Sequence, residues 1–416
     1  MSEWKRYKLS ELYEMSSGIS STKEQAGHGS PFLSFSVVFN NYFLPDSLID
    51  LMDTTDGEKQ KYSINEGDIF LTRTSETVDE LAMSSVALKD YPEASFSGFL
   101  KRLRPVDKTI VYPKFMSFYL RSPLFRRTII NNTVMTLRAS FNEAMFSYLE
   151  IMLPDFETQK KIGDFLYSLE KKKQINNQVN QELEAMAKTL YDYWFVQFDF
   201  PDQNGKPYKS SGGKMVYHPE LKREIPEGWG VDSLWNIANF YNGLAMQKYR
   251  PDTNGDDYLP VIKIREMMNG FSKDTEKARL DIPTEAVVER GDILFSWSAT
   301  LEVVIWGKEK GALNQHIFKV TSDTYPKSFI YFELKSYLKV FKAIAELRKT
   351  TMGHITQDHL KQANIVVPPI DLISKLDAKL QPIMLKQQII ENQNQELTKL
   401  RDWLLPMLMN GQVKVE

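Results

Sequence analysis

The second half of the chain repeats the first, and a repeat of this kind constrains the fold more than any local pattern does. Residues 4–19 match residues 229–244 without a gap, at a constant separation of 225 positions. Residues 151–190 match residues 365–404 in the same way, at a separation of 214 positions. The change in separation places insertions and deletions between these blocks, as expected when variable loops are attached to a constant frame.

Each copy begins with a module of mixed helical and strand pattern, in residues of roughly 1–155 and 225–370. Short apolar runs after a turn are typical of buried strands, and the clearest follow Gly67-Asp68 and Gly291-Asp292. We therefore expect an α+β fold in each module. The expected strands lie within 64–73, 96–103, 287–297 and 316–320, and the expected helices lie near 113–130 and 327–348.

After Pro154 and Pro368, apolar residues recur every three or four positions, which is typical of α-helices. About 35 residues at 1.5 Å each form a helix of roughly 50 Å, which is too long to be covered by one small module. Two apolar stripes of similar length therefore predict that the helices pair as an antiparallel or crossing coiled coil. The expected pairing residues are Ile162, Leu166, Leu169, Ile175, Leu183, Met186, Leu190, Leu376, Leu380, Ile383, Ile390, Leu397, Leu400 and Leu404.

Polar residues and one proline interrupt the two stripes. Asn176, Asn180, Gln393 and Asn394 are expected to fix the register of the helix pair at some cost in stability. Pro382 has no backbone N–H, so we expect either a kink or the true start of the second helix there.

Residues 198–226 are rich in proline and glycine, which indicates a linker between the copies. An aromatic cluster precedes the linker and requires burial. It either docks the helix end onto its own chain or binds a partner protein. The aromatic residues are Tyr191, Tyr193, Trp194, Phe195 and Phe198.

The composition of the chain excludes several classes of protein. The absence of cysteine excludes disulfides, thiolate nucleophiles and cysteine zinc sites. No apolar run is long enough to span a membrane and no signal peptide is present, so we expect a cytoplasmic protein. The formal net charge of -2 is unusual for an isolated DNA-binding domain. Basic residues cluster at 101–104 and 121–127, either as solvated faces or as contacts to an acidic partner.

The residue patterns of catalytic sites are missing or incomplete. A DNA methyltransferase requires an Asn- or Asp-Pro-Pro-aromatic tetrapeptide, and Val367-Pro368-Pro369-Ile370 lacks both ends. The chain contains no Gly-x-x-x-x-Gly-Lys-Ser/Thr phosphate loop. Asp377-Ala378-Lys379 resembles part of a nuclease site but lacks a suitably spaced upstream carboxylate. His354 and His359 lack a third metal ligand nearby in the sequence, so we expect neither a catalytic residue nor a metal site.

Over essentially its whole length, the chain resembles the specificity subunit of type I restriction-modification enzymes. The order and spacing of the motifs carry this resemblance. They are residues 4–18 with 229–243, Gly67-Asp68-Ile69 with Gly291-Asp292-Ile293, Asn314-Gln315-His316, residues 365–369, and the segment from Tyr193-Trp194-Phe195 to residues 225–229. The first module departs from the family pattern, because Ser97-Gly98 stands where the second has Asn314-Gln315.

The resemblance implies a non-catalytic subunit with two target-recognition domains, each reading one half of a split DNA site. The paired helices would act as a ruler, as dimer geometry sets half-site spacing in simpler DNA readers. It also implies two modification (methyltransferase) subunits, which use S-adenosylmethionine, and restriction subunits, which use ATP and Mg²⁺. The chain itself would hold no cofactor, and its partners would flip the base.

The domain boundaries follow from the repeat and the resemblance together. We expect target-recognition domain 1 at residues 1–155 and a central long helix at 156–197. A linker at 198–226, target-recognition domain 2 at 227–370 and a distal long helix at 371–410 complete the chain.

Candidate DNA contacts are chosen at strand ends and in basic loops of both modules. Arginine and lysine bind phosphates, whereas side chains in the grooves read bases. Arg73-Thr74-Ser75 comes directly at the end of an expected buried strand. The other residues are chosen because they occupy matching positions in the repeat or lie in basic loops. The candidates are Lys23, Arg73, Thr74, Ser75, Arg102 and Arg138 in the first module, and Lys248, Arg250, Arg265, Trp297, Ser298, Arg348, Lys349 and His354 in the second.

Two other functions are compatible with parts of the pattern. The chain could be a stand-alone methyltransferase or nuclease, in which case it would modify or cleave DNA without partners. It could also be an assembly scaffold that does not bind DNA. The scaffold hypothesis predicts no sequence-dependent protection of any duplex. The modules have diverged more than the helices, which favours two different targets over one repeated partner.

Overall fold

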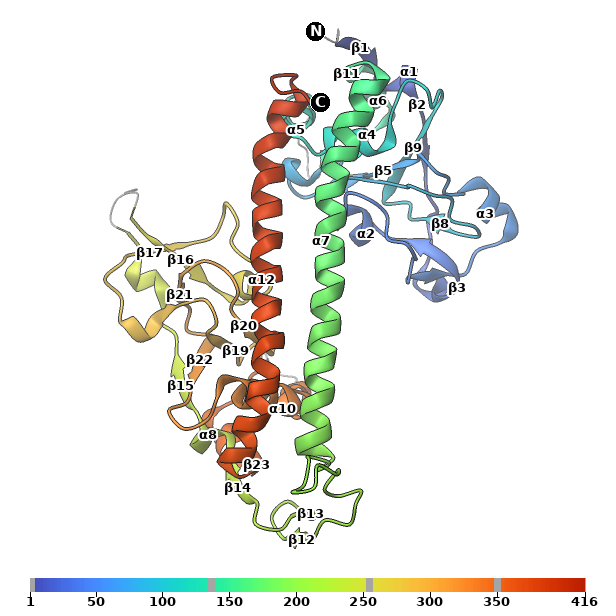
Figure 1. Cartoon of the computed structure of the whole chain (residues 1–416). Helices are drawn as coiled ribbons and strands as arrows, with labels where there is room; N and C mark the ends of the chain where they lie inside the picture. Colours follow the sequence, from blue (N-terminus) through green and yellow to red (C-terminus); the bar gives the residue numbers. More distant parts are fainter. Residues whose placement is uncertain (1–3, 134–138, 252–256, 348–352, 416) are drawn as a thin grey trace. The chain divides into compact units, whose positions relative to one another are not determined.

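The computed structural model describes residues 4–133, 139–251, 257–347 and 353–415. The chain forms two compact units, one from Met1–Gln174 with Glu396–Glu416 and one from Ile175–Gln395. Each unit contains one α+β module together with part of the two long helices (Figure 1). These helices are α7 (Phe156–Tyr191) and α12 (Ile370–Met409).

The centre of the first module is a four-stranded antiparallel sheet in the order β2-β9-β5-β7. All four residues of β5 are buried, which explains the continuous apolar sequence after Gly67-Asp68. The strands are β2 (Tyr13–Ser17), β5 (Ile69–Thr72), β7 (Ser84–Val86) and β9 (Leu100–Pro105).

Smaller elements of the first module surround this sheet. Strands β4, β3 and β8 form a second sheet, β1 pairs with β11, and β6 pairs with β10. The strands are β1 (Lys5–Lys8), β3 (Ala26–Leu33), β4 (Leu51–Met52), β6 (Thr74–Ser75), β8 (Ser95–Phe96), β10 (Ala139–Ser140) and β11 (Glu150–Leu153). The helices are α1 (Leu9–Leu12), η1 (Lys23–Gln25), α2 (Phe35–Asn40), α3 (Asp56–Lys61), η2 (Val78–Glu80), α4 (Pro113–Tyr119), α5 (Pro123–Asn132) and α6 (Glu143–Tyr148).

The second module has the same central sheet, in the order β15-β22-β19-β20. A second sheet has the order β17-β16-β21-β18, and β14 pairs with β23. The strands are β14 (Gly230–Ser233), β15 (Asn239–Asn242), β16 (Leu259–Ile262), β17 (Lys277–Ala278), β18 (Val287–Val288), β19 (Ile293–Ser296), β20 (Glu302–Ile305), β21 (Gly311–Leu313), β22 (Ile317–Thr321) and β23 (Asn364–Val367). The helices are α8 (Leu234–Ile237), η4 (Met246–Tyr249), α9 (Ile264–Asn269), η5 (Thr284–Ala286), α10 (Lys327–Leu347) and α11 (Gln357–Gln362).

The Gly-Asp turn before the central strand is built in the same way in both modules. Gly67 and Gly291 have φ angles of 92° and 87°, a left-handed conformation that favours glycine. The carboxylates of Asp68 and Asp292 each accept the backbone N–H three residues earlier, at 2.8 Å. The sequence repeat is therefore also a repeat of local backbone structure.

The two long helices run antiparallel, as expected. In the second unit, Nε2 of Gln387 donates to Oε2 of Glu184 at 3.1 Å. In the first unit, Nη1 of Arg401 lies 3.1 Å from Oε2 of Glu170. Later residues of α12 therefore meet earlier residues of α7, which is the register of an antiparallel pair (Figure 1).

The expected apolar seam is only partly present. Ile175, Met186 and Leu400 were expected in it, but they are 43%, 58% and 40% exposed, so their assignment to the seam is wrong. Much of the stripe packs on the modules instead, because each long helix also serves as a wall of its module core. Ile162 and Leu166 belong to the first module's core. The remaining predicted pairing residues are buried or half-buried: Leu169, Leu183, Leu190, Leu376, Leu380, Ile383, Ile390, Leu397 and Leu404.

Helix α12 continues through Pro382, so the second long helix does not start at this residue. Proline removes one backbone hydrogen bond, the one that the carbonyl of Ala378 would otherwise accept. Both residues are exposed, and water can hydrate that carbonyl. The helix therefore tolerates the proline on its solvent side.

Residues 198–226 carry a β-hairpin, formed by β12 (Met215–His218) and β13 (Arg223–Pro226). The aromatic cluster before it is largely buried, because α7 ends in a π-helical turn, Asp192–Val196, that directs Trp194 and Phe195 into the second module's core. The ring of Phe195 lies 5.8 Å from that of Trp229. The cluster thus docks the helix end onto its own chain.

The basic clusters at 101–104 and 121–127 consist largely of internal arginines. The guanidinium of Arg121 donates to the carbonyls of Val38, Phe39, Asn41 and Ser84, at 2.6–3.0 Å. Burial lowers its pKa to about 10. Neither a solvated face nor a partner contact therefore describes Arg121, because its guanidinium is bonded to four backbone carbonyls of its own module.

Candidate nucleic-acid interface

In the first module, the end of β5 brings three loops together at Arg73. Its backbone N–H donates to the carbonyl of Phe99 at 2.8 Å, and its carbonyl accepts from the N–H of Phe141 at 2.8 Å. Thr74 and Ser75 continue as β6 and pair with β10. The backbone of Arg73 is thus held on both sides, while its side chain is exposed.

The second module repeats this clamp at Trp297, which follows β19. The N–H of Trp297 donates to the carbonyl of His316 at 3.3 Å, and its carbonyl accepts from Ile355 at 3.0 Å. Ser298 forms an antiparallel bridge with His354. Three predicted contact residues, Trp297, Ser298 and His354, are therefore brought together.

At the first clamp the side chain of Arg73 is exposed, whereas the neighbouring Lys101 is buried, at 6% exposure. Nη1 of Arg73 lies 3.4 Å from the carbonyl oxygen of Gly98. Close by, Nζ of Lys101 donates to Oγ of Ser17 at 2.8 Å. Burial, and then the positive charge of Arg73, lower the pKa of Lys101. Phe99 lies between Gly98 and Lys101 in the chain, and its side chain is 64% exposed.

The side chains at the second clamp form an aromatic group instead. Nε1 of Trp297 donates to Oδ1 of Asn242 at 3.0 Å. Its ring centroid lies 5.6 Å from that of His316 and 6.4 Å from that of His354. Trp297 and His354 are half-buried and His316 is exposed, and aromatic rings placed in this way suit contact with base edges better than contact with phosphates.

Arg102 was predicted to contact DNA, but it lies inside the first module. It is 8% exposed, its Nη1 donates to the carbonyl of Ser63 at 2.6 Å, and it packs over the ring of Phe96. This guanidinium stabilises the interior of the module and is not a surface contact. Ser75 is also buried, and its Oγ accepts the N–H of Thr77.

The other predicted contacts lie on separate loops. Lys23, Lys248 and Arg250 are exposed, on η1 and at η4. Arg265 is exposed at the start of α9, where it forms an ion pair with the buried carboxylate of Glu266 at 2.7 Å. Arg138, Arg348 and Lys349 lie outside the described residues.

Three exposed or half-buried residues at the clamps were missed by the sequence analysis: Asn242, Phe99 and His316. A signal for the last two was present. The separation of 217 that aligns Ser97-Gly98 with Asn314-Gln315 also aligns Phe99 with His316. Asn242 carries no such signal, because its role depends on the neighbouring strand β22 and the ring of Trp297.

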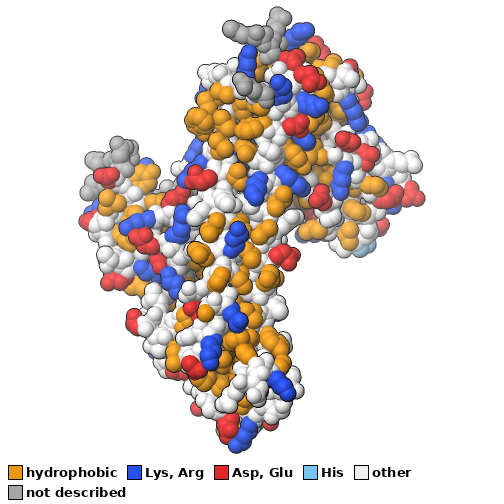
Figure 2. Space-filling model, in the orientation of Figure 1, with side chains coloured by type: hydrophobic (Ala, Val, Ile, Leu, Met, Phe, Trp, Pro, Cys, Tyr) orange, Lys and Arg blue, Asp and Glu red, His pale blue; other side chains and the backbone are white. Residues whose placement is uncertain are grey.

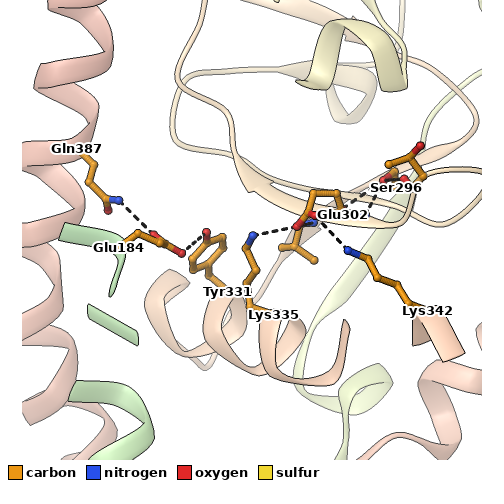
Figure 3. A network of polar contacts seen from close by, with 9 residues as sticks. Glu184, Ser296, Glu302, Tyr331, Lys335, Lys342 and Gln387 are labelled. Carbon is orange, nitrogen blue, oxygen red and sulfur yellow. Dashed lines mark hydrogen bonds and ion pairs between the residues drawn. The ribbon is translucent and has the colours of Figure 1, made fainter. Parts of the chain in front are cut away.

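Each module is fixed to the long helices of its own unit by polar contacts. In the second unit, the hydroxyl of Tyr331 on α10 donates to Glu184 on α7 at 2.8 Å, and inside the module Lys335 and Lys342 of α10 both pair with Glu302 (Figure 3). In the first unit, the carboxylate of Asp164 accepts from Tyr112 and Lys114, both at 2.7 Å. The modules are therefore attached to the helices through side chains that have defined geometry.

The motifs that were weighed as catalytic have structural contacts. Oδ1 of Asp377 accepts from Ser328 at 2.7 Å, and Nδ1 of His359 accepts the N–H of Thr356 at 2.9 Å. Within the described part of the chain, no group of three His, Asp or Glu side chains is placed to hold a metal ion. None of the described helices combines the length and apolarity that crossing a membrane requires.

Positive and negative side chains are interspersed on the face drawn in Figure 2, in keeping with the net charge of -2. The fold and the two clamps define a duplicated α+β binding protein with paired long helices. The chain belongs to the family described as type I restriction modification DNA specificity domain, whose model matches residues 1–185 and 226–399. Such specificity subunits are the non-catalytic DNA-recognition subunits of their systems.

Three individual proteins illustrate the similarity. The type I restriction enzyme HindI specificity subunit of Haemophilus influenzae is 25% identical over 474 aligned positions, covering 99% of this chain and 100% of the relative. The MjaIX specificity subunit of Methanocaldococcus jannaschii is 28% identical over 281 positions, covering 64% of this chain and 61% of the relative. The crystal structure of the S subunit from M. genitalium has a TM-score of 0.54 at 13% identity, covering 98% of this chain and 96% of that one.

Proposed function

We propose that this chain is the subunit of a type I restriction-modification complex that reads a DNA site in two halves, one half per module. The observation that carries the proposal is the repeated clamp. The same two backbone hydrogen bonds hold Arg73 in one module and Trp297 in the other. A constant frame that presents different side chains is suited to reading two different base sequences.

The proposed domain organisation retains the boundaries expected from the sequence: 1–155 and 227–370 as recognition domains, 156–197 and 371–410 as long helices, and 198–226 as the connection. In this proposal the helix pair sets the separation of the half-sites. Helices are suited to this role because their length per residue is fixed and their side chains lock the register. The polar contacts of Tyr331 and Asp164 with their neighbours support a fixed attachment.

We assign base reading and phosphate binding to different residues. Arg73, Trp297 and His354 lie at the clamps, where their positions are fixed, and they would read base edges. Thr74 and Ser298 would support them. The exposed cations Lys23, Lys248, Arg250 and Arg265 would bind phosphates.

The proposed partners are two modification subunits and, in a restricting complex, the restriction subunits. Exposed apolar residues on the long helices of the second unit provide a docking surface of suitable chemistry: Val179 and Met186 on α7, and Leu385 and Ile389 on α12, are 39–58% exposed. Apolar side chains are visible along this part of the helices in Figure 2. Because the chain carries a net charge of -2, much of the affinity for DNA would come from its partners.

The proposal is tested with the complex of this chain and its co-expressed modification subunits. The complex is incubated with a library of randomised duplexes, and bound or methylated molecules are sequenced. We expect enrichment of a motif with two defined halves and a spacer of constant length. Methylation or cleavage by the chain alone would indicate an enzyme, and no enrichment with the complex would indicate a scaffold.

A further inference from the structure

Phe99 and His316 occupy equivalent positions in the two modules, and the backbone around them is held by matching hydrogen bonds. The N–H of the preceding residue donates to a carbonyl in both cases, Gly98 to Ile19 at 2.7 Å and Gln315 to Leu244 at 2.9 Å. The residue that follows closes a turn in both cases. The N–H of Leu100 donates to the carbonyl of Ser97 at 2.9 Å, and the N–H of Ile317 donates to the carbonyl of Asn314 at 3.1 Å. Each module therefore presents a planar side chain at the same place on its frame.

Both rings are exposed, although neither position requires an exposed ring for the fold. Phe99 is 64% exposed, but the chain next to it is tightly packed. A Cβ atom added to Gly98 would lie only 2.7 Å from the carbonyl oxygen of Ile19. Oγ of Ser97 accepts the N–H of Phe99 at 3.2 Å and holds the turn. An exposed phenyl ring on such a rigid turn loses little conformational entropy on binding.

Phe99 has a neighbour that suits DNA. Its carbonyl accepts the backbone N–H of Arg73, whose side chain is exposed. A duplex that meets Arg73 would therefore meet the phenyl ring as well. On the edges of stacked base pairs, the apolar group available to a phenyl ring is the C5-methyl of thymine, which is exposed in the major groove.

We propose that Phe99 reads the methyl group of a thymine in the half-site of the first module, and that His316 reads a base at the equivalent place in the other half-site. This inference rests on the proposed function. It adds a specificity-determining position to each module and states the chemistry recognised in the first. The imidazole of His316 offers hydrogen-bonding nitrogens in place of an apolar ring, so the two half-sites are expected to differ here.

The test combines a change in the protein with removal of the methyl group from the DNA. The complex with the modification subunits first selects its site from randomised duplexes. Each thymine of that site is then replaced singly by uracil, which lacks only the methyl group. Wild-type affinity is expected to fall about fourfold at one thymine, the effect of burying roughly one methyl group. The Phe99→Ala complex is expected to bind both duplexes equally and more weakly than wild type binds the thymine duplex.

Val106→Ala is the matched control, because Val106 is 61% exposed and follows the other end of strand β9. It is expected to retain the uracil effect. His316→Ala is expected to relax the second half-site and leave the first unchanged. Thermal unfolding of each variant checks that the fold is kept.

The outcomes separate the inference from the proposed function. If wild type selects a two-part site but no uracil substitution weakens it, or Phe99→Ala keeps the uracil effect, the methyl contact is wrong and the proposed function stands. If wild type selects no site, the proposed function and this inference are both wrong.

Discussion

Asn176 on α7 and Asn394 on α12 hydrogen-bond to each other inside the helix pair, with Nδ2 of Asn176 2.9 Å from Oδ1 of Asn394. Their side chains are buried, at 3% and 7% exposure. Nδ2 of Asn394 also donates to Oδ1 of Asn177 at 2.8 Å. Buried amides of this kind stabilise one register of a helix pair, because a shifted register would leave them without partners.

We predict that Asn394→Ala destabilises the protein by about 1–3 kcal/mol, because the buried amide of Asn176 loses its acceptor. Urea unfolding of the full chain measures this change. The control is Gln393→Ala, since Gln393 is exposed one residue earlier on the same helix. Equal stability of the two variants would show that the asparagine pair does not hold the helices.

The order of modules and long helices is predictable from the sequence because the second half of the chain repeats the first. The two matched blocks predicted two α+β modules, and the spacing of apolar residues after Pro154 predicted a helix that begins at Phe156. The similar length of the two stripes predicted an antiparallel or crossing helix pair. These features depend on periodicity, which is visible in a single chain.

Burial of individual charges was not predictable in the same way. Arg102 and Arg121 carry the same local signal as a surface cation, and only the fold reveals the carbonyls of Ser63 and Val38 that they bind. The exposure of Met186 was not predictable either, because the apolar spacing does not show which residues of the stripe the modules and the partner helix leave uncovered. Side-chain roles that depend on distant backbone groups require the structure.

We predict that Arg73→Ala weakens binding of the complex to its cognate duplex by about 1–3 kcal/mol if the guanidinium reads a guanine. The loss should be concentrated at one base pair of the first half-site. Arg6→Ala is the control, because it removes the same charge from an exposed position of the same module. Binding isotherms for duplexes with each base pair substituted in turn measure the effect. Equal affinities for the two variants would remove Arg73 from the interface.

Trp297→Phe is predicted to alter recognition of the second half-site only. Phenylalanine retains an aromatic ring beside His316 and His354 but cannot donate to Oδ1 of Asn242. The orientation of the ring is then less restricted. Selection of randomised duplexes by the variant complex should show weaker base preference in one half and an unchanged other half. A change in both halves would contradict the assignment of Trp297 to one module.

Glu333 introduces a pH dependence into stability. Burial raises the pKa of its carboxyl group to about 7, against the smaller lowering effect of the hydrogen bond from Tyr191. The folded state therefore favours the neutral acid. This contribution to stability is fully present below the pKa of the unfolded state, near 4.3, and is lost as the pH rises to about 7.

We accordingly predict that Glu333→Gln is more stable than wild type at about pH 8 and differs from it least near pH 4.5, because glutamine is neutral throughout. Thermal unfolding across this range measures the difference. Glu285→Gln, at an exposed position of the same module, provides the control. A difference between wild type and Glu333→Gln that does not change with pH would show that folding does not raise the pKa of Glu333.

The most direct test of two-part reading is a genome-wide map of methylated adenines in cells that carry the complex. The map is recorded with the wild-type chain and with a chimera in which residues 1–153 come from a relative. We predict a motif with two halves in both maps, in which one half changes in the chimera while the other half and the spacer stay the same. A change in both halves, or methylation that does not depend on this chain, would contradict one half-site per module.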